Sequence, residues 1–254
     1  MADAGARAAA HLHGRRHLAA LEVRLTPRTG RAGCAVRSVV DGRVAKDNVA
    51  AYRLLGAHHV DVTEQGRDGQ VAFVVVETLQ SRVRVAVEVR RVARVPNGTG
   101  PPTVTAVDEP GVVGDELFFE VRNGHEVVVE KVAGVATSRD VVISEPVRAA
   151  VGAAGGAPSF AGLRDDYARA WEGLWRRFAV EVDGEAEEVL AVRAHLVHVL
   201  QTLSPHTIDC DAGVPARGLH GEAYRGHVFW DELFVLPLLD LRLPELTRSL
   251  LLYR

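Results

Sequence analysis

The sequence predicts an α+β multidomain protein: an antiparallel β-sandwich (residues 1–143), a helical linker (144–184) and an all-α region (185–254). Three observations lead to this order. Apolar and polar residues alternate along the first part of the chain, which is typical of strands. Asp-Gly and Asn-Gly pairs separate these segments and mark turns. Beyond the sandwich the apolar residues recur at helical spacing, so strands give way to helices.

The strand segments differ in the burial that their patterns predict. In Val83–Val89 every second residue is valine, and Arg82, Arg84 and Arg90 lie on the other face. This alternation predicts one apolar face and one solvated face. Val71–Val76 is a continuous apolar run, which predicts a strand covered on both faces.

Two turn-forming segments lie between predicted strands. Asn123-Gly124 separates Glu116–Arg122 from Glu126–Lys131 and predicts a type I′ hairpin, because both residues tolerate positive φ. The segment Val95–Gly114 is rich in Pro and Gly and is predicted to be an exposed loop.

Helices are predicted from residue 144 onward. Ser144 is the expected N-cap of the first helix, Gly155-Gly156 ends it, and Ser159 is expected to cap the second. The second helix carries a mostly aromatic stripe predicted to pack in a core: Phe160, Leu163, Tyr167, Trp171, Leu174, Trp175 and Phe178. Three more helices are predicted at 185–203, 231–239 and 244–253.

Composition excludes several classes of protein. The formal net charge is −3 and the sequence pI is about 6.4, so bulk charge favours neither nucleic acid nor an anionic membrane as a partner. No apolar run reaches the ~20 residues of a membrane-spanning helix, and residues 1–10 lack a signal-peptide core. Cys34 and Cys210 form no disulfide framework. A cytoplasmic, reduced protein is expected.

The connection between Leu203 and Trp230 carries the densest set of ionisable and aromatic residues. It ends in Trp230-Asp231, a pair suited to a sugar, because a carboxylate accepts hydrogen bonds from hydroxyls while an indole covers an apolar ring face. Asp231 could instead be the N-cap of the following helix, and Trp230 could be a core residue. A capping carboxylate can still present an oxygen to a ligand.

Other chemistries have weak signals. His195 and His198 stand three apart on a predicted helix, but no carboxylate or cysteine set completes a zinc site, so ordinary helix positions are expected for both. The sequence has neither a Gly-x-Ser-x-Gly elbow nor a Gly-Lys-Ser/Thr phosphate loop.

The segment 216–231, Ala-Arg-Gly-Leu-His-Gly-Glu-Ala-Tyr-Arg-Gly-His-Val-Phe-Trp-Asp, resembles glycoside hydrolase family 65, the family of maltose, trehalose and kojibiose phosphorylases. The similarity continues through residues 231–237 and 242–245. Segments 16–22 and 137–140 also resemble the family, so the resemblance covers nearly the whole chain.

The resemblance implies a β-sandwich, a helical linker and the first helices of an incomplete (α/α)₆ barrel. It also implies that Trp230 and Asp231 line the subsite for the glucosyl unit. Four more residues of the motif are weaker candidates for substrate binding: Phe229, Arg217, His227 and Glu222. Many members have a further residue after Trp-Asp that is missing here, so Glu232 is given no role.

The implied activity is inverting phosphorolysis of an α-glucosidic disaccharide, with inorganic phosphate as co-substrate and no cofactor. The family's general acid, a Glu, and its phosphate loop lie further along the barrel than Arg254. No catalytic residue is therefore expected in this chain, which is interpreted as a fragment or a truncated member.

Three alternatives stay open. A hydrolase of the same family would use water in place of phosphate. A non-catalytic carbohydrate-binding or structural protein would use the sandwich as its working part. An interaction module, such as a homodimer, would pair through the apolar segment at 250–254.

Overall fold

The computed structural model describes the backbone of residues 2–9 and residues 15–45, 58–140, 143–218, 224 and 227–253. The chain forms two compact units, one of residues 1–11 and 17–165 and one of residues 12–16 and 166–254. The division falls inside helix α2 (Phe160–Phe178), which contributes residues to both units. The linker limits inferred from the sequence stay predictions.

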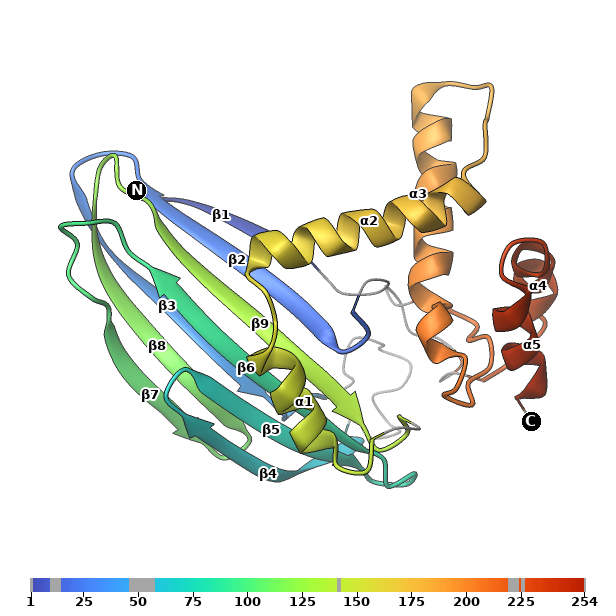
Figure 1. Cartoon of the computed structure of the whole chain (residues 1–254), viewed down its shortest axis with the longest axis horizontal. Helices are drawn as coiled ribbons and strands as arrows, with labels where there is room; N and C mark the ends of the chain where they lie inside the picture. The colour runs from blue at the N-terminus through green and yellow to red at the C-terminus, as the bar shows by residue number, and fades with distance from the viewer. Residues whose placement is uncertain are drawn as a thin grey trace. The chain divides into compact units, whose positions relative to one another are not determined.

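The first unit is a β-sandwich of antiparallel strands (Figure 1). A six-stranded sheet has the order β1-β2-β9-β6-β5-β4, and a three-stranded sheet has the order β3-β8-β7. The strands are β1 (Ala2–Ala9), β2 (Leu18–Pro27), β3 (Arg31–Asp41), β4 (Val60–Asp68), β5 (Val71–Thr78), β6 (Arg84–Arg94), β7 (Thr103–Glu109), β8 (Val112–Arg122) and β9 (Val127–Thr137).

The two sheets bury a core of valines, leucines and a phenylalanine between them. Leu25, Val127 and Val129 of the larger sheet pack with Leu117 and Phe119 of β8. A second cluster joins the sheets through Val40, Val74, Val89 and Val113, among others. The predicted antiparallel sandwich followed by helices is confirmed.

Helix α1 (Pro146–Gly155) covers the outer face of the six-stranded sheet, the face turned away from the three-stranded sheet (Figure 1). Val75, Ala86 and Ala136 pack there against Ala150. The prediction that Val71–Val76 is covered on both faces is therefore confirmed. The predicted solvated face of Val83–Val89 is wrong, because this helix lies on it and leaves Glu88 only 1% exposed.

Close backbone contact holds α1 against strand β9. A Cβ on Gly134 would lie 2.2 Å from the carbonyl oxygen of Ala150, so only glycine allows the helix to approach this strand so closely. Arg90 of β6 donates to the carbonyl oxygens of Ala154 (3.1 Å) and Ala157 (2.9 Å), at and just beyond the end of the helix. The Ala154 carbonyl also accepts from the Ala157 backbone N–H at 3.3 Å, so Arg90 adds a second donor at the end of the helix.

Two turn predictions are corrected by the topology. Asn123-Gly124 joins β8 to β9, which belong to different sheets, so it forms no hairpin. Gly124 has φ +80°, whereas Asn123 does not have positive φ, and this excludes a type I′ turn. Val95–Gly114 is not a loop throughout, because it contains the exposed edge strand β7 and the start of β8. The Pro and Gly residues lie mostly around these strands.

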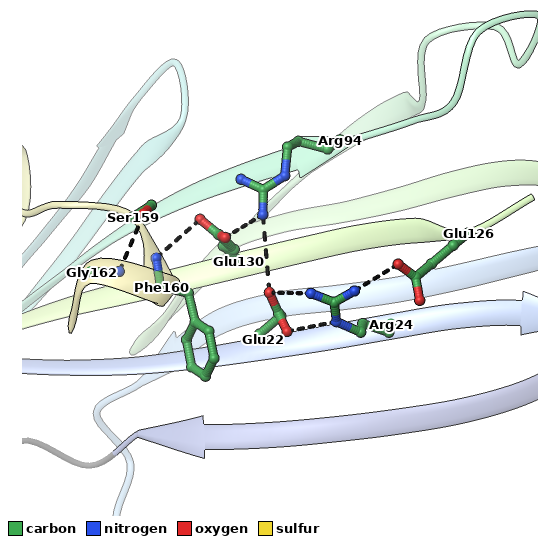
Figure 2. A network of polar contacts seen from close by, with 8 residues as sticks. All are labelled: Glu22, Arg24, Arg94, Glu126, Glu130, Ser159, Phe160 and Gly162. Atoms are coloured by element: carbon green, nitrogen blue, oxygen red, sulfur yellow. Dashed lines mark hydrogen bonds and ion pairs between the residues drawn. The ribbon is translucent and has the colours of Figure 1, made fainter. Parts of the chain in front are cut away.

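The start of α2 is fixed to the outer face by a polar network (Figure 2). Glu22 and Glu130 stand directly opposite each other on β2 and β9, and both are buried. Arg24 pairs with Glu22 at 2.7 Å, and Arg94 contacts both carboxylates, so the two like charges are compensated. Glu130 also accepts a hydrogen bond from the Phe160 backbone N–H, at 3.4 Å, at the first residue of the helix.

Helix starts agree with the sequence only in part. Helix α1 begins at Pro146 with Glu145 at the N-cap position and no side-chain cap bond, so the prediction of Ser144 as N-cap is wrong. Ser159 accepts from the Gly162 N–H at 3.4 Å, as predicted for α2. Phe160 and Leu163 of the aromatic stripe are buried against the sheet.

The second unit is helical in its described residues. It contains the rest of α2, then α3 (Ala186–Thr202), a short 3₁₀ turn (Pro205–Thr207), α4 (Glu232–Asp240) and α5 (Pro244–Leu252). Its core includes Phe178, Leu200, Leu239 and Leu246. In the part of the chain that the structure describes, no helix has the length and apolar character needed to cross a membrane.

Replacing Gly134 by alanine should destabilise the first unit by ~1–3 kcal/mol, the usual cost of forcing atoms into a packed site. Gly33→Ala is the matched control, because a Cβ there meets no atom within 4 Å. Urea unfolding followed by circular dichroism measures both variants. Equal midpoints for the two would contradict the close contact described for α1.

The Glu88→Gln variant should change how stability depends on pH. Burial raises the pKa of the Glu88 carboxyl above its ordinary value of 4.5. The unfolded chain then loses this proton first, so the wild type loses stability as pH rises from 4.5 through the raised pKa. Glutamine removes this loss, and the stability advantage of the variant should grow across that window. Urea unfolding from pH 4 to pH 8 tests this.

The control for that experiment is Glu120→Gln, which removes a carboxyl whose side chain is 77% exposed. Its stability difference from the wild type should stay nearly constant over the same pH range. A constant difference for Glu88→Gln as well would show that this carboxyl has the same pKa in the folded and unfolded chains.

Candidate functional site

Helix α3 supplies one wall of a pocket in the second unit. Its start is held by a capping box, in which the Glu185 and Glu188 side chains each bond to the other residue's backbone N–H. His195 and His198 lie three residues apart, and therefore on one face of this helix. Val199 and Leu203 continue the wall toward the core, where Leu203 is 4% exposed.

The segment after α3 forms the opposite wall. Val214 is buried in the core of the unit and anchors this segment. A Cβ on Gly213 would lie 2.5 Å from Val228 and 2.7 Å from Tyr253, so glycine is needed where these side chains cross the backbone. Pro215, Ala216 and Arg217 follow Val214 along the pocket.

Asp231 lies at the N-cap position of α4 and makes no side-chain capping bond there. The capping alternative therefore does not use the carboxylate oxygens of Asp231. The side chain instead lines the pocket together with Phe234 and Val235 of the same helix.

The pocket encloses about 310 Å³. That volume is at the small end of ligand pockets, which span ~300–1,000 Å³. Its polar lining comes from three separate stretches of chain: His195, His198 and Thr202 from α3, Arg217 from the connection, and Asp231 from the start of α4. Apolar side chains form the rest of the lining, as is usual for small-molecule sites.

The predicted site residues are only partly brought together. Asp231 and Arg217 line the same pocket, but Trp230, Phe229 and His227 do not. Trp230 is 67% exposed, with its ring 5.5 Å from that of Phe234 and nearly perpendicular to it. The alternative of core burial for Trp230 is therefore wrong.

The remaining aromatic groups form a separate cluster. Phe229 lies with its ring 5.3 Å from Tyr224 and 5.7 Å from the stacked ring of His227. The fourth candidate from the motif, Glu222, lies outside the described residues. The roles of the six candidates in substrate binding stay predictions.

The sequence did not predict His195 and His198 as pocket residues. Their spacing showed that they share a helix face, but the facing wall begins sixteen residues after His198. Two features of the sequence could have predicted them: the shared helix face, and the segment rich in ionisable residues that follows the helix. Among the described residues, no group of three or more His, Cys, Asp or Glu side chains could hold a metal ion.

This arrangement can bind a polyhydroxylated ligand. Asp231 accepts hydrogen bonds from hydroxyls, Arg217 only donates, and Thr202 and the imidazoles can do either. Phe234 and Val235 offer apolar surface for the C–H face of a sugar ring.

Comparison with family models identifies both parts of the chain. The model described as "Glycosyl hydrolase family 65, N-terminal domain" matches residues 9–174. The model described as "Glycosyl hydrolase family 65 central catalytic domain" matches residues 193–254. The chain belongs to glycosyl hydrolase family 65. The resemblance found in the sequence is confirmed.

Two curated relatives match most of the chain. An uncharacterized glycosyl hydrolase from Mycobacterium tuberculosis is 40% identical over 240 residues, which cover 94% of this chain and 18% of the relative. A trehalose 6-phosphate phosphorylase from Lactococcus lactis is 28% identical over 222 residues, covering 86% and 27%. The chain thus spans less than a third of the length of these relatives.

Solved structures give the same fold. A chain named for kojibiose phosphorylase, from the human microbiome, matches with a TM-score of 0.78 and 16% identity. The match covers 100% of this family 65 chain and 32% of that chain. The sandwich and the partial helical domain are therefore those of the family.

Proposed function

We propose that this chain is part of a glycoside phosphorylase that cleaves an α-glucosidic disaccharide such as trehalose, maltose or kojibiose. Inorganic phosphate is the co-substrate, β-glucose 1-phosphate and glucose are the products, and no cofactor is needed. Membership in family 65 and relatives named as phosphorylases support the reaction class. The observation that carries the assignment to this site is Asp231 in a pocket of monosaccharide size.

In the proposed reaction a carboxylic acid gives its proton to the glycosidic oxygen as the bond from that oxygen to the anomeric carbon breaks. A phosphate oxygen forms the new bond to the anomeric carbon from the opposite face, so the configuration inverts. Phosphate needs no activating base, because it is already a competent nucleophile. The pocket residues of this chain bind and orient the glucosyl unit.

Asp231 has two roles in this proposal. Its oxygens accept hydrogen bonds from sugar hydroxyls and so fix the ring, and its negative charge stabilises the positive charge that develops on the ring in the transition state. Trp230 shapes the rim beside Phe234. The general acid is assigned to none of the residues of this chain, so a longer parent chain would supply it.

Replacing Asp231 by alanine should weaken glucose binding to the 254-residue chain about tenfold or more, because a hydrogen bond to a charged group is lost. The substitution removes no capping bond from α4, because the Asp231 side chain makes none. Asp240→Ala, at the other end of the same helix, is the control and should bind as the wild type does. NMR titration with glucose measures all three, and equal affinities would place the sugar elsewhere.

Phosphate dependence separates phosphorolysis from hydrolysis. In a full-length parent enzyme, release of glucose from the disaccharide should require inorganic phosphate and yield β-glucose 1-phosphate. Cleavage at an undiminished rate without phosphate would favour the hydrolase. The 254-residue chain alone should show no turnover, and phosphorolysis by it would show that the acid lies within this chain.

A further inference from the structure

The three-stranded sheet of the first unit carries a groove on its outer face. Leu117 and Phe119 of β8 pack in the core between the two sheets. Because successive side chains of a strand point to opposite faces, Phe118 and Glu120 lie on the other side. The groove has a volume of about 570 Å³, and residues of β3 and β8, the first residue of β7 and the Gly100-Pro101 segment line it.

Small neighbours leave the ring of Phe118 uncovered. Phe118 lies on the central strand of this sheet, directly opposite Ala35 of β3 and Thr103 of β7. Gly33, two residues before Ala35, has no side chain, and a Cβ there would meet no atom within 4 Å. The Phe118 side chain is therefore 44% exposed although it stands on a central strand. A strand holds such a ring more precisely than a loop would.

Polar groups accompany this ring in the groove. The Glu120 side chain is 77% exposed and pairs with Arg31 at 3.6 Å, which is longer than a hydrogen bond, so its oxygens keep capacity to accept from a ligand. Arg31 also balances the charge of this carboxylate, and the balance favours a neutral ligand over an ion. The exposed Thr103 hydroxyl can both donate and accept.

The apolar part of the groove has the size of one ring. Among the described residues that line it, Phe118 is the one large apolar side chain that is exposed. A stable protein partner would need about 800 Å² on each side with an apolar centre. A single aromatic face with acceptors and donors beside it instead matches a sugar ring, which has an apolar C–H face and a rim of hydroxyls.

We propose that this groove binds a neutral saccharide, with one sugar ring stacked on Phe118 and hydroxyls bonded to Glu120 and Thr103. It is a second saccharide site, on the sandwich. The proposal depends neither on Asp231 nor on the phosphorolysis reaction, so it can fail or hold independently of the proposed function.

Amide NMR titration of the 254-residue chain with maltose tests the proposal. Saturable shifts are expected at Ala35, Thr103 and Glu120. Phe118→Leu keeps apolar bulk but loses the flat ring, so it should weaken maltose binding at these positions at least about fivefold. Phe118→Trp should preserve or strengthen the binding, because it restores a flat aromatic face.

Two further variants test the polar contacts. Glu120→Ala should weaken maltose binding about tenfold, because a hydrogen bond to a charged group is lost. Arg122→Gln removes a charge from the same strand outside the groove, and its affinity should stay within about twofold of the wild type. Circular dichroism confirms that each variant is folded.

Three results would overturn the proposal. Maltose could shift only residues of the second unit, or bind the groove equally well in the wild type and in Phe118→Leu. Tetramethylammonium could bind the groove more tightly than maltose, which would make it a cation site. Sedimentation could reveal a dimer that Phe118→Leu dissociates, which would assign the ring to a second copy of the chain. Each result leaves the proposed function standing if glucose binding still depends on Asp231.

Discussion

The close approach of helix α1 to strand β9 is the constraint on which the first unit depends. It leaves no room for a side chain at Gly134 and turns the outer face of the six-stranded sheet into a second core. Most residues on this face are then apolar, small or paired, and the buried carboxyl of Glu88, whose pKa is raised by burial, is an exception. Ala86 and Ala136 are small, and Arg90 pairs with helix carbonyls. The opposed carboxylates of Glu22 and Glu130 share Arg94, and Glu22 also pairs with Arg24. The start of α2 is held on the same face by Glu130.

Local pattern predicted much of this fold. Alternation predicted a strand at Val83–Val89, where β6 begins, and the continuous apolar run Val71–Val76 predicted β5. Helices α3, α4 and α5 begin and end within a residue or two of their predicted limits. The errors arose where distant contacts decide the outcome. Arg84 and Arg90 indicated a solvated face because the sequence does not show that a helix beginning 56 residues after Arg90 packs there. Asn123-Gly124 indicated a hairpin because the sequence does not show that the strands on either side belong to different sheets.

The site could be predicted only in outline for the same reason. Asp231 and Arg217 belong to one continuous motif, and the structure brings both to one pocket. Trp230 belongs to it too, yet it stands beside the pocket because neighbouring residues at the start of a helix point in different directions. His195 and His198 are outside the motif, and they line the pocket only because α3 packs against the Val214 segment. The spacing of residues along the sequence does not predict that contact.

Asp231 lies at the start of helix α4 and also lines the pocket. An aspartate at an N-cap usually gives one oxygen to the first helical N–H groups, and that bond would lower its capacity to accept from a ligand. Here the cap bond is absent, while Gly213 and Val214 hold the facing segment in place from the core side. Buried leucines such as Leu200 and Leu246 form the core of the second unit. No side-chain cap bond at the start of α4 is therefore lost when Asp231 is exchanged.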